Sequence, residues 1–367
     1  MSGATIGPVL PLMSEVFADT PNAEFLTRLV LTMPALFIVL SSTGCGYLVD
    51  RYGRKKILLG ATLLYGLSGS AGAWLDTLTA ILVSRALLGI SVAAVMTVCI
   101  TLIGDYYKDT ERQHFMGIQT AAMAFGGVIF ISAGGFLADI SWRAPFLIYT
   151  FALFLLPAIA LIITEPEKAE TSGPDPKNNG VSRAPLLTIF LIIAAAFTGM
   201  AMFYMIPVHI PFLLSGFGDI SNTRIGLALS SFVLMGALVS LQYHRFLKRM
   251  SYPSIYLICF FLLGSGYMLI SFSDSYYEIY AGMILGGIGS GLLMPNSNVW
   301  LLSEAPDHLR GRFSGMLTTA VFLGQFLSPI MTQPLVDVLS ISMVFLVTGG
   351  AVASITLLLT FGRFLIK

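Results

Sequence analysis

Charged residues are scarce in this chain of 367 residues. Lys, Arg, Asp and Glu together make up 11% of it, whereas hydrophobic residues make up 56% and the mean hydropathy is +0.84. A soluble domain normally carries about 25% charged residues. A surface that faces mostly water is therefore excluded, and we expect an all-α membrane protein.

Cysteines and chemical motifs are also few. Cys45, Cys99 and Cys259 fall within apolar stretches and show no metal-ligand spacing. The glycine-rich run at 286–291, GGIGSG, lacks the G-x-G-x-x-G spacing of a nucleotide loop and follows no predicted strand. No catalytic triad is recognisable. We expect no enzyme, no cofactor, no metal and no nucleic-acid partner.

Long apolar windows are what the sequence does have. A bilayer-spanning helix needs about 20 apolar residues, and these windows are too rich in Gly and Pro for barrel strands. Ten windows contain no Lys, Arg, Asp or Glu, and an eleventh, 77–104, is interrupted by Arg85; the ten lie at 29–49, 57–75, 113–138, 144–164, 184–218, 225–244, 250–273, 279–303, 313–336 and 338–362. The sequence predicts eleven full transmembrane helices.

Residues 4–18 add a short apolar segment at the start. Fifteen helical residues reach about 22 Å, which is less than the roughly 30 Å hydrocarbon core. We expect a first helix that lacks its front half, which gives twelve helices with the first one truncated.

Basic residues fall on one side of this topology. Sixteen of the twenty would lie there: Arg51, Arg54, Lys55, Lys56, Lys108, Arg112, Lys168, Lys177, Arg183, Arg245, Lys248, Arg249, Arg310, Arg312, Arg363 and Lys367. Arg28, Arg143 and Arg224 fall in loops on the other side, which leaves Arg85 as the charged residue well inside a span. The positive-inside rule predicts cytoplasmic termini in an inner or plasma membrane.

The chain divides into two halves. The polar, Pro- and Gly-rich segment 164–185 predicts a cytoplasmic linker between six-helix bundles at 1–163 and 186–367. An R-x-x-F-x-G pattern begins at Arg112 and again at Arg310, before the fifth and the eleventh span. This repeat at one topological place suggests duplication, and parallel six-helix repeats are a known transporter design.

The stretch GYLVDRYGRKK at 46–56 places five charges between two apolar windows. Each charge would cost about 2.5–3.5 kcal/mol at the centre of a bilayer, so the stretch must be a short turn outside the lipid. Residues Gly46 to Lys55 resemble the G-x-L-x-D-R-x-G-R-K loop of the major facilitator superfamily, which also lies between spans two and three. The resemblance extends over nearly the whole chain and implies two six-helix bundles that expose a central site alternately to each side.

The resemblance also implies a conformational latch. Asp50 would face the helix that starts near Gly311, and Arg54 would pair with Asp105; Gly46, Arg51 and Gly53 complete the loop motif. A helix start carries free N–H groups that favour a carboxylate. Alternatively, these charges only mark the cytoplasmic face and hold the turn.

The residues Arg85 and Gly89 resemble the buried-arginine motif of proton-linked members of that family. The fifth span has the glycines of the drug–proton antiporter signature, but Phe130-Ile131 replaces its Gly-Pro pair. We expect an efflux permease for a small organic solute, such as a drug-like compound or a sugar, with proton antiport. The alternatives are a metabolite uptake symporter and a non-transporting receptor with a transporter-like fold.

Polar groups within the spans are candidates for a substrate and proton cavity. They are Arg85, Tyr204, His209, Asn296, Asn298 and Gln325. Each has a structural alternative: Arg85 could bind backbone carbonyls of neighbouring helices, His209 could be interfacial, and the neutral groups could join helices. We expect a small-molecule substrate, protons and the lipid bilayer as partners of a monomer.

Overall fold

The computed structural model describes residues 4–166, 185–218, 220–306 and 309–365. Helices dominate this part of the chain, and no strand occurs within it. The first half comprises η1 (Ala4–Val9), α1 (Leu10–Val16), α2 (Ala23–Tyr52), α3 (Arg54–Ser70), η2 (Ala71–Ala73), α4 (Leu78–Tyr106), α5 (Asp109–Ile140), η3 (Ala144–Thr150), α6 (Phe151–Phe154) and α7 (Leu156–Ile162). The predicted linker lies mostly outside the described residues.

The second half begins after that segment. It comprises α8 (Leu186–Ser215), α9 (Asn222–Leu241), α10 (Tyr243–Leu247), α11 (Tyr252–Ser271), α12 (Tyr276–Ser290), α13 (Leu293–Glu304), α14 (Arg310–Val336) and α15 (Ile341–Leu365). Short segments continue one another, as α12 and α13 do. The described residues thus form twelve membrane-crossing units in two six-helix bundles, and the first unit, Ala4–Val16, is short.

Helix length and composition explain this arrangement. Nine of the described helical segments are long and apolar enough to cross a membrane unaided. Many of their large apolar side chains point outward, and Leu161 and Phe154 are 84% and 77% exposed. Such side chains suit lipid rather than water.

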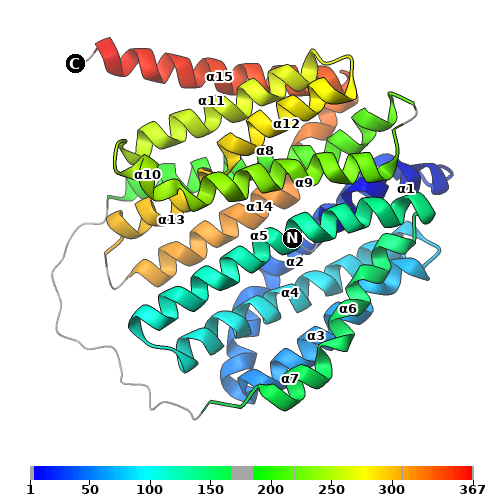
Figure 1. The fold of residues 1–367 in the computed structure, drawn as a ribbon, viewed down its shortest axis with the longest axis vertical. Coiled ribbons are helices and arrows are strands. Elements are labelled where there is room, and N and C mark those ends of the chain that lie inside the picture. The colour runs from blue at the N-terminus through cyan, green and yellow to red at the C-terminus, as the bar shows by residue number, and fades with distance from the viewer. Residues whose placement is uncertain (1–3, 167–184, 219, 307–308, 366–367) are drawn as a thin grey trace.

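Figure 1 shows the two bundles side by side, with α5 of the first half next to α9 of the second. We call the end with residues 53, 107–108 and 164–166 the linker end. The opposite end, with residues 17–22, 141–143 and 216–218, is the distal end. Helix α2 runs from the distal end to the linker end, and α14 runs the other way.

Candidate functional site

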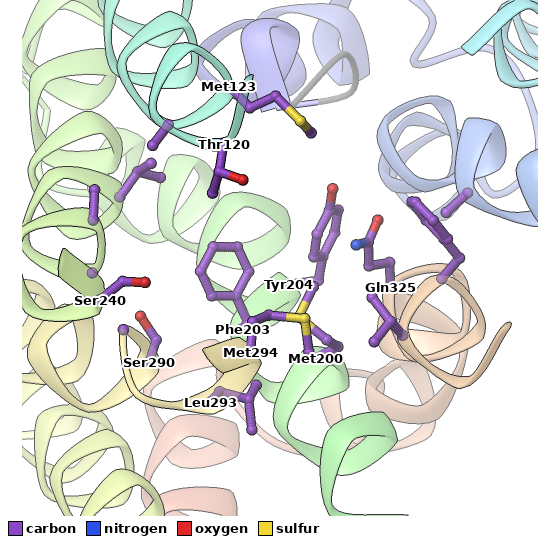
Figure 2. Close-up of a pocket in the computed structure, with 18 of the residues that line it drawn as sticks. Thr120, Met123, Met200, Phe203, Tyr204, Ser240, Ser290, Leu293, Met294 and Gln325 are labelled. Carbon is purple, nitrogen blue, oxygen red and sulfur yellow. The ribbon is translucent and has the colours of Figure 1, made fainter. Parts of the chain in front are cut away.

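A cavity of about 360 Å³ lies between the two halves. Its walls come from α2, α4 and α5 of the first half and from α8, α9, α12, α13 and α14 of the second. Figure 2 shows side chains from both halves around this space. A site between two bundles is where a rocking motion changes access most.

The cavity wall is uncharged and mostly apolar. Its polar side chains are Thr120, Tyr204, Ser240, Ser290 and Gln325. Four methionines also line it: Met96, Met123, Met200 and Met294. Methionine is flexible and polarizable, and it is over-used at binding surfaces that accept many ligands. The wall suits a neutral or weakly charged amphiphile.

Tyr204 and Gln325 form the polar centre of this wall. Both side chains point into the same space in Figure 2, and they are only 7% and 9% exposed. Among the described residues, neither the Tyr204 hydroxyl nor the Gln325 amide has a hydrogen-bond partner. Buried polar groups are nearly always satisfied, so these two are available to a ligand. Sequence reasoning predicted both.

The tenth membrane-crossing unit is broken beside the cavity. Helix α12 ends at Ser290 and α13 begins at Leu293, and Ser290, Gly291 and Pro295 all line the wall. Pro295 lacks the N–H that would donate to the Gly291 carbonyl in an α-helix. A Cβ on Gly291 would collide with the carbonyl oxygen of Gly236. The φ and ψ angles of Gly291 and Leu292 stay in the right-handed helical region, so glycine at 291 is required by the close approach of Gly236 and not by the backbone conformation.

The structure does not bring Asn296 and Asn298 to the cavity. Asn296 is fully buried; its Oδ1 accepts from the Tyr243 hydroxyl at 3.1 Å and its Nδ2 donates to the Tyr252 carbonyl at 3.1 Å. Burial raises the pKa of Tyr243 to about 12, so its hydroxyl stays protonated and remains a donor. Asn298 is exposed and donates to the Met294 carbonyl at 3.0 Å. Asn296 thus joins α13 to α10 and α11, whereas Asn298 bonds only within its own helix.

Arg85 also lies away from the cavity. It is fully buried, and its Nη2 donates to the Ser68 carbonyl at 2.9 Å and to the Gly69 carbonyl. Its guanidinium carbon lies 5.0 Å from the Phe146 ring centre and 5.1 Å from that of Tyr149. Arg85 thus connects α4 to α3 and η3, which agrees with the alternative expectation that it binds backbone carbonyls of neighbouring helices.

His209 and Arg28 lie together near the distal end. His209 is fully buried, with Nε2 2.8 Å from Thr332 Oγ1 of α14. Arg28 of the first half lies over the Phe212 ring, 4.9 Å from its centre, and donates to Gln333 Oε1 at 2.9 Å. These contacts make α2, α8 and α14 meet at one point.

The expectation that Arg28 lies in a loop is wrong. It belongs to α2 and is fully buried, and Glu24 one turn earlier is its ion-pair partner. A charge within a helix is tolerated when it is paired and hydrogen-bonded. The spacing of Glu24 and Arg28, four residues apart, was the signal in the sequence that could have revealed this pair.

Contacts between the halves gather at the distal end. The Asp139 carboxylate accepts from the backbone N–H of Asn222 at 2.7 Å and of Thr223 at 3.1 Å, and from the Thr223 hydroxyl at 2.5 Å. A Cβ on Gly135 would lie 2.9 Å from the Cα of Gly226, so the backbones of α5 and α9 nearly touch there. The molecule is therefore closed at the distal end, and sequence reasoning missed the part of Asp139 in this closure.

The loop at 46–56 has one of the two contacts expected of it. Arg54 Nε lies 3.0 Å from Asp105 Oδ2, and Gly53 has φ +93°, which favours glycine. Glu165 accepts from the backbone N–H of Arg54 at 2.6 Å and of Lys55 at 2.8 Å, an arrangement that sequence reasoning did not predict.

The second expected contact, between Asp50 and the start of α14, is not made in this conformation. Asp50 is exposed and has no hydrogen-bond or ion-pair partner among the described residues. A Cβ on Gly311 would meet no atom within 4 Å. Arg51 donates to the Tyr47 hydroxyl at 3.0 Å, and Gly46 likewise faces open space.

A comparison with family models assigns this architecture to a protein family. The model described as Major Facilitator Superfamily matches residues 1–219 and again 192–365. The chain belongs to this superfamily. Its members are transporters rather than enzymes, so the chain is a multi-pass transport protein. Within the part of the chain that the structure describes, no group of three or more His, Cys, Asp or Glu could hold a metal.

Curated relatives within the superfamily include several exporters. The chain is 27% identical over 345 residues to Multidrug resistance protein 1 of Bacillus subtilis, covering 91% of this chain and 86% of that protein. It is 25% identical to the Quinolone resistance protein NorA of Staphylococcus aureus, with 96% and 92% covered. It is 24% identical to the Bacillibactin exporter of B. subtilis, with 88% and 83% covered.

Solved structures support the same fold. A D-xylose-proton symporter superimposes with a TM-score of 0.77 at 14% identity, covering 97% of this chain and 93% of the other. A bacterial homologue of the lysosomal transporter Spinster superimposes with a TM-score of 0.72 at 13% identity, over 100% and 92% of the two chains. At such identities the likeness concerns the major facilitator fold alone.

Proposed function

We propose that this transporter exports small organic molecules of neutral or weakly charged, amphiphilic character. The observation that carries the proposal is the uncharged cavity, in which the free polar groups of Tyr204 and Gln325 stand among apolar side chains and methionines. Apolar walls with a few convergent polar groups are typical of small-molecule sites. The exporter relatives named above support the same direction.

Alternating access would deliver the substrate. In this conformation Asp139 and Gly135 hold the distal end closed against α9, and a second conformation would open there while the linker end closes around Asp50. We infer that the linker end faces the cytoplasm, that both termini lie there, and that one copy of the chain suffices. The bundles would be 1–163 and 186–367, joined by 164–185.

Proton antiport is the coupling that we propose. No Asp or Glu is among the buried residues in the part of the chain that the structure describes; Glu24 and Asp139 are exposed and are bound to Arg28 and to the start of α9. We infer that His209 carries the proton, because it is a fully buried histidine whose Nε2 lies 2.8 Å from Thr332 Oγ1 of α14.

Flux measurements in proteoliposomes test the proposal. We expect a fluorescent neutral amphiphile loaded at the linker-end side to be exported when the opposite side is made acidic. Tyr204→Phe combined with Gln325→Leu should reduce this export at least tenfold. Proton-driven accumulation in the opposite direction would support the uptake symporter instead, and absence of any flux with tight ligand binding would support a receptor.

A further inference from the structure

A second hollow lies between the halves at the linker end, separate from the transport cavity. Its volume is about 570 Å³, and it shares no lining residue with the cavity. Thr43 of α2, Phe190 and Phe197 of α8, and Arg312 and Met316 of α14 are among its walls. We call this hollow the α2–α14 groove. Since α2 and α14 belong to different bundles, its width depends on how far the bundles have separated.

The groove has the depth of one lipid leaflet. Along α14 its lining runs from Arg312 near the helix start to Leu323. Eleven helical residues span about 16 Å, which is roughly half of the 30 Å hydrocarbon core. Phe190 and Met316 are 65% and 48% exposed. An acyl chain that enters from the leaflet at the linker end would lie along these side chains.

Charge at the mouth of the groove indicates the headgroup. Arg312 is the charged residue of the lining, it is exposed, and it has no carboxylate partner among the described residues. It lies in the first turn of α14. The helix dipole disfavours a cation there, and the free backbone N–H groups of that turn attract an anion. A phosphate would satisfy the guanidinium and the helix start together.

We propose that the α2–α14 groove binds an anionic phospholipid from the leaflet at the linker end. One acyl chain lies against Phe190, Phe197 and Met316, and the headgroup phosphate pairs with Arg312. Basic pockets between transmembrane helices bind anionic headgroups in this way. Ten further basic residues with described side chains lie in the segments of this end and raise the local concentration of anionic lipid: Arg51, Arg54, Lys55, Lys56, Lys108, Arg112, Arg245, Lys248, Arg249 and Arg310.

Binding would also favour the conformation described here. The acyl chain occupies space between α2 and α14 that closure of the linker end must remove, so the lipid binds the open state better. This consequence rests on alternating access, whereas the binding itself does not. The two can therefore be tested apart.

Native mass spectrometry of the purified full-length chain tests the charge contact. The probes are phosphatidylglycerol and phosphatidylcholine with identical acyl chains. We expect wild type to retain phosphatidylglycerol at about tenfold lower lipid concentration, and Arg312→Gln to remove that preference. Arg245→Gln is the matched control, because Arg245 is an exposed arginine outside the groove that donates to Gln242; it should keep the preference.

A pair of glycine variants tests the acyl-chain contact. Gly315 lines the groove, and a Cβ there would meet no atom within 4 Å. Gly315→Phe should fill the space and lower retention of both lipids about tenfold. Gly117 holds the same place in the R-x-x-F-x-G pattern of the first half and is equally unobstructed, so Gly117→Phe should lower neither.

Three results would overturn the proposal. One is unchanged phosphatidylglycerol retention in both Arg312→Gln and Gly315→Phe. Another is an equal loss in Arg245→Gln or Gly117→Phe, which would indicate diffuse attraction to the basic end. The third is equal retention of both lipids by wild type, which would mean that the groove does not select an anionic lipid. Melting curves of all four variants establish that each is folded.

Discussion

At the scale of single residues, we propose that substrate recognition depends on the Tyr204 hydroxyl and the Gln325 amide. A neutral hydrogen bond contributes about 0.5–1.5 kcal/mol, or roughly a twofold to tenfold change in affinity. We expect Gln325→Leu to raise the KM for export by about that factor without lowering the melting temperature. Asn298→Leu, on an exposed side chain that does not line the cavity, is the control and should change neither.

Arg85 is expected to affect stability rather than substrate binding. Arg85→Ala leaves the Ser68 and Gly69 carbonyls without their donor and opens a space between Phe146 and Tyr149. We expect the free energy of unfolding to fall by about 2–4 kcal/mol. Transport per folded molecule should remain near the wild-type rate. A normal melting temperature together with abolished export would instead give Arg85 a direct part in transport.

The prediction on proton coupling concerns His209. His209→Gln keeps a side chain that can bind the Thr332 hydroxyl but cannot titrate. We expect it to bind substrate normally and to lose the acceleration of export that an inward proton gradient produces. Export by this variant that still follows the gradient, measured with a pH-sensitive dye in proteoliposomes, would exclude His209 as the carrier.

At the scale of elements, we propose that a helix start and a carboxylate control access at each end of the molecule. Asp139 binds the start of α9 in this conformation, and we predict that Asp50 binds the start of α14 in the other. A carboxylate at a helix start contributes about 1 kcal/mol, which is roughly a fivefold shift between conformations. The two carboxylates would then bias the same equilibrium in opposite directions.

Neutral variants of the two carboxylates test this arrangement. Asp139→Asn should raise the accessibility of cysteines placed at the distal end, and Asp50→Asn should raise it at the linker end. The double variant should return close to the wild-type balance. If Asp50→Asn transports normally with unchanged accessibility at the linker end, the latch does not exist and the loop charges only mark that face.

The paired topology is the prediction at the scale of the whole molecule. A tag after Lys367 and a tag at Lys168 should be accessible from the same side of the membrane, because six helices separate them. Labelling of intact cells and of inverted vesicles measures this. Accessibility from opposite sides would contradict the six-plus-six arrangement.

Sequence patterns predicted much at the larger scales and less at the smaller ones. The apolar windows predicted the membrane-crossing units, and the loop at 46–56 indicated the superfamily. Of the six residues predicted to line the cavity, the structure brings Tyr204 and Gln325 to it, whereas Arg85, His209, Asn296 and Asn298 lie elsewhere. Burial alone could not separate these groups, because a helix in lipid buries side chains on several faces.

The sequence by itself determined that this chain crosses a membrane many times. A stretch of about 20 residues without charge has its lowest free energy as a helix in lipid. It also determined which side carries most of the positive charge. Only the tertiary structure decided which polar groups face the cavity, that Arg28 and Glu24 form a pair inside α2, and that Asp139 closes the distal end. These outcomes depend on helix rotation and on the relative placement of two bundles, which the order of residues along one helix does not encode.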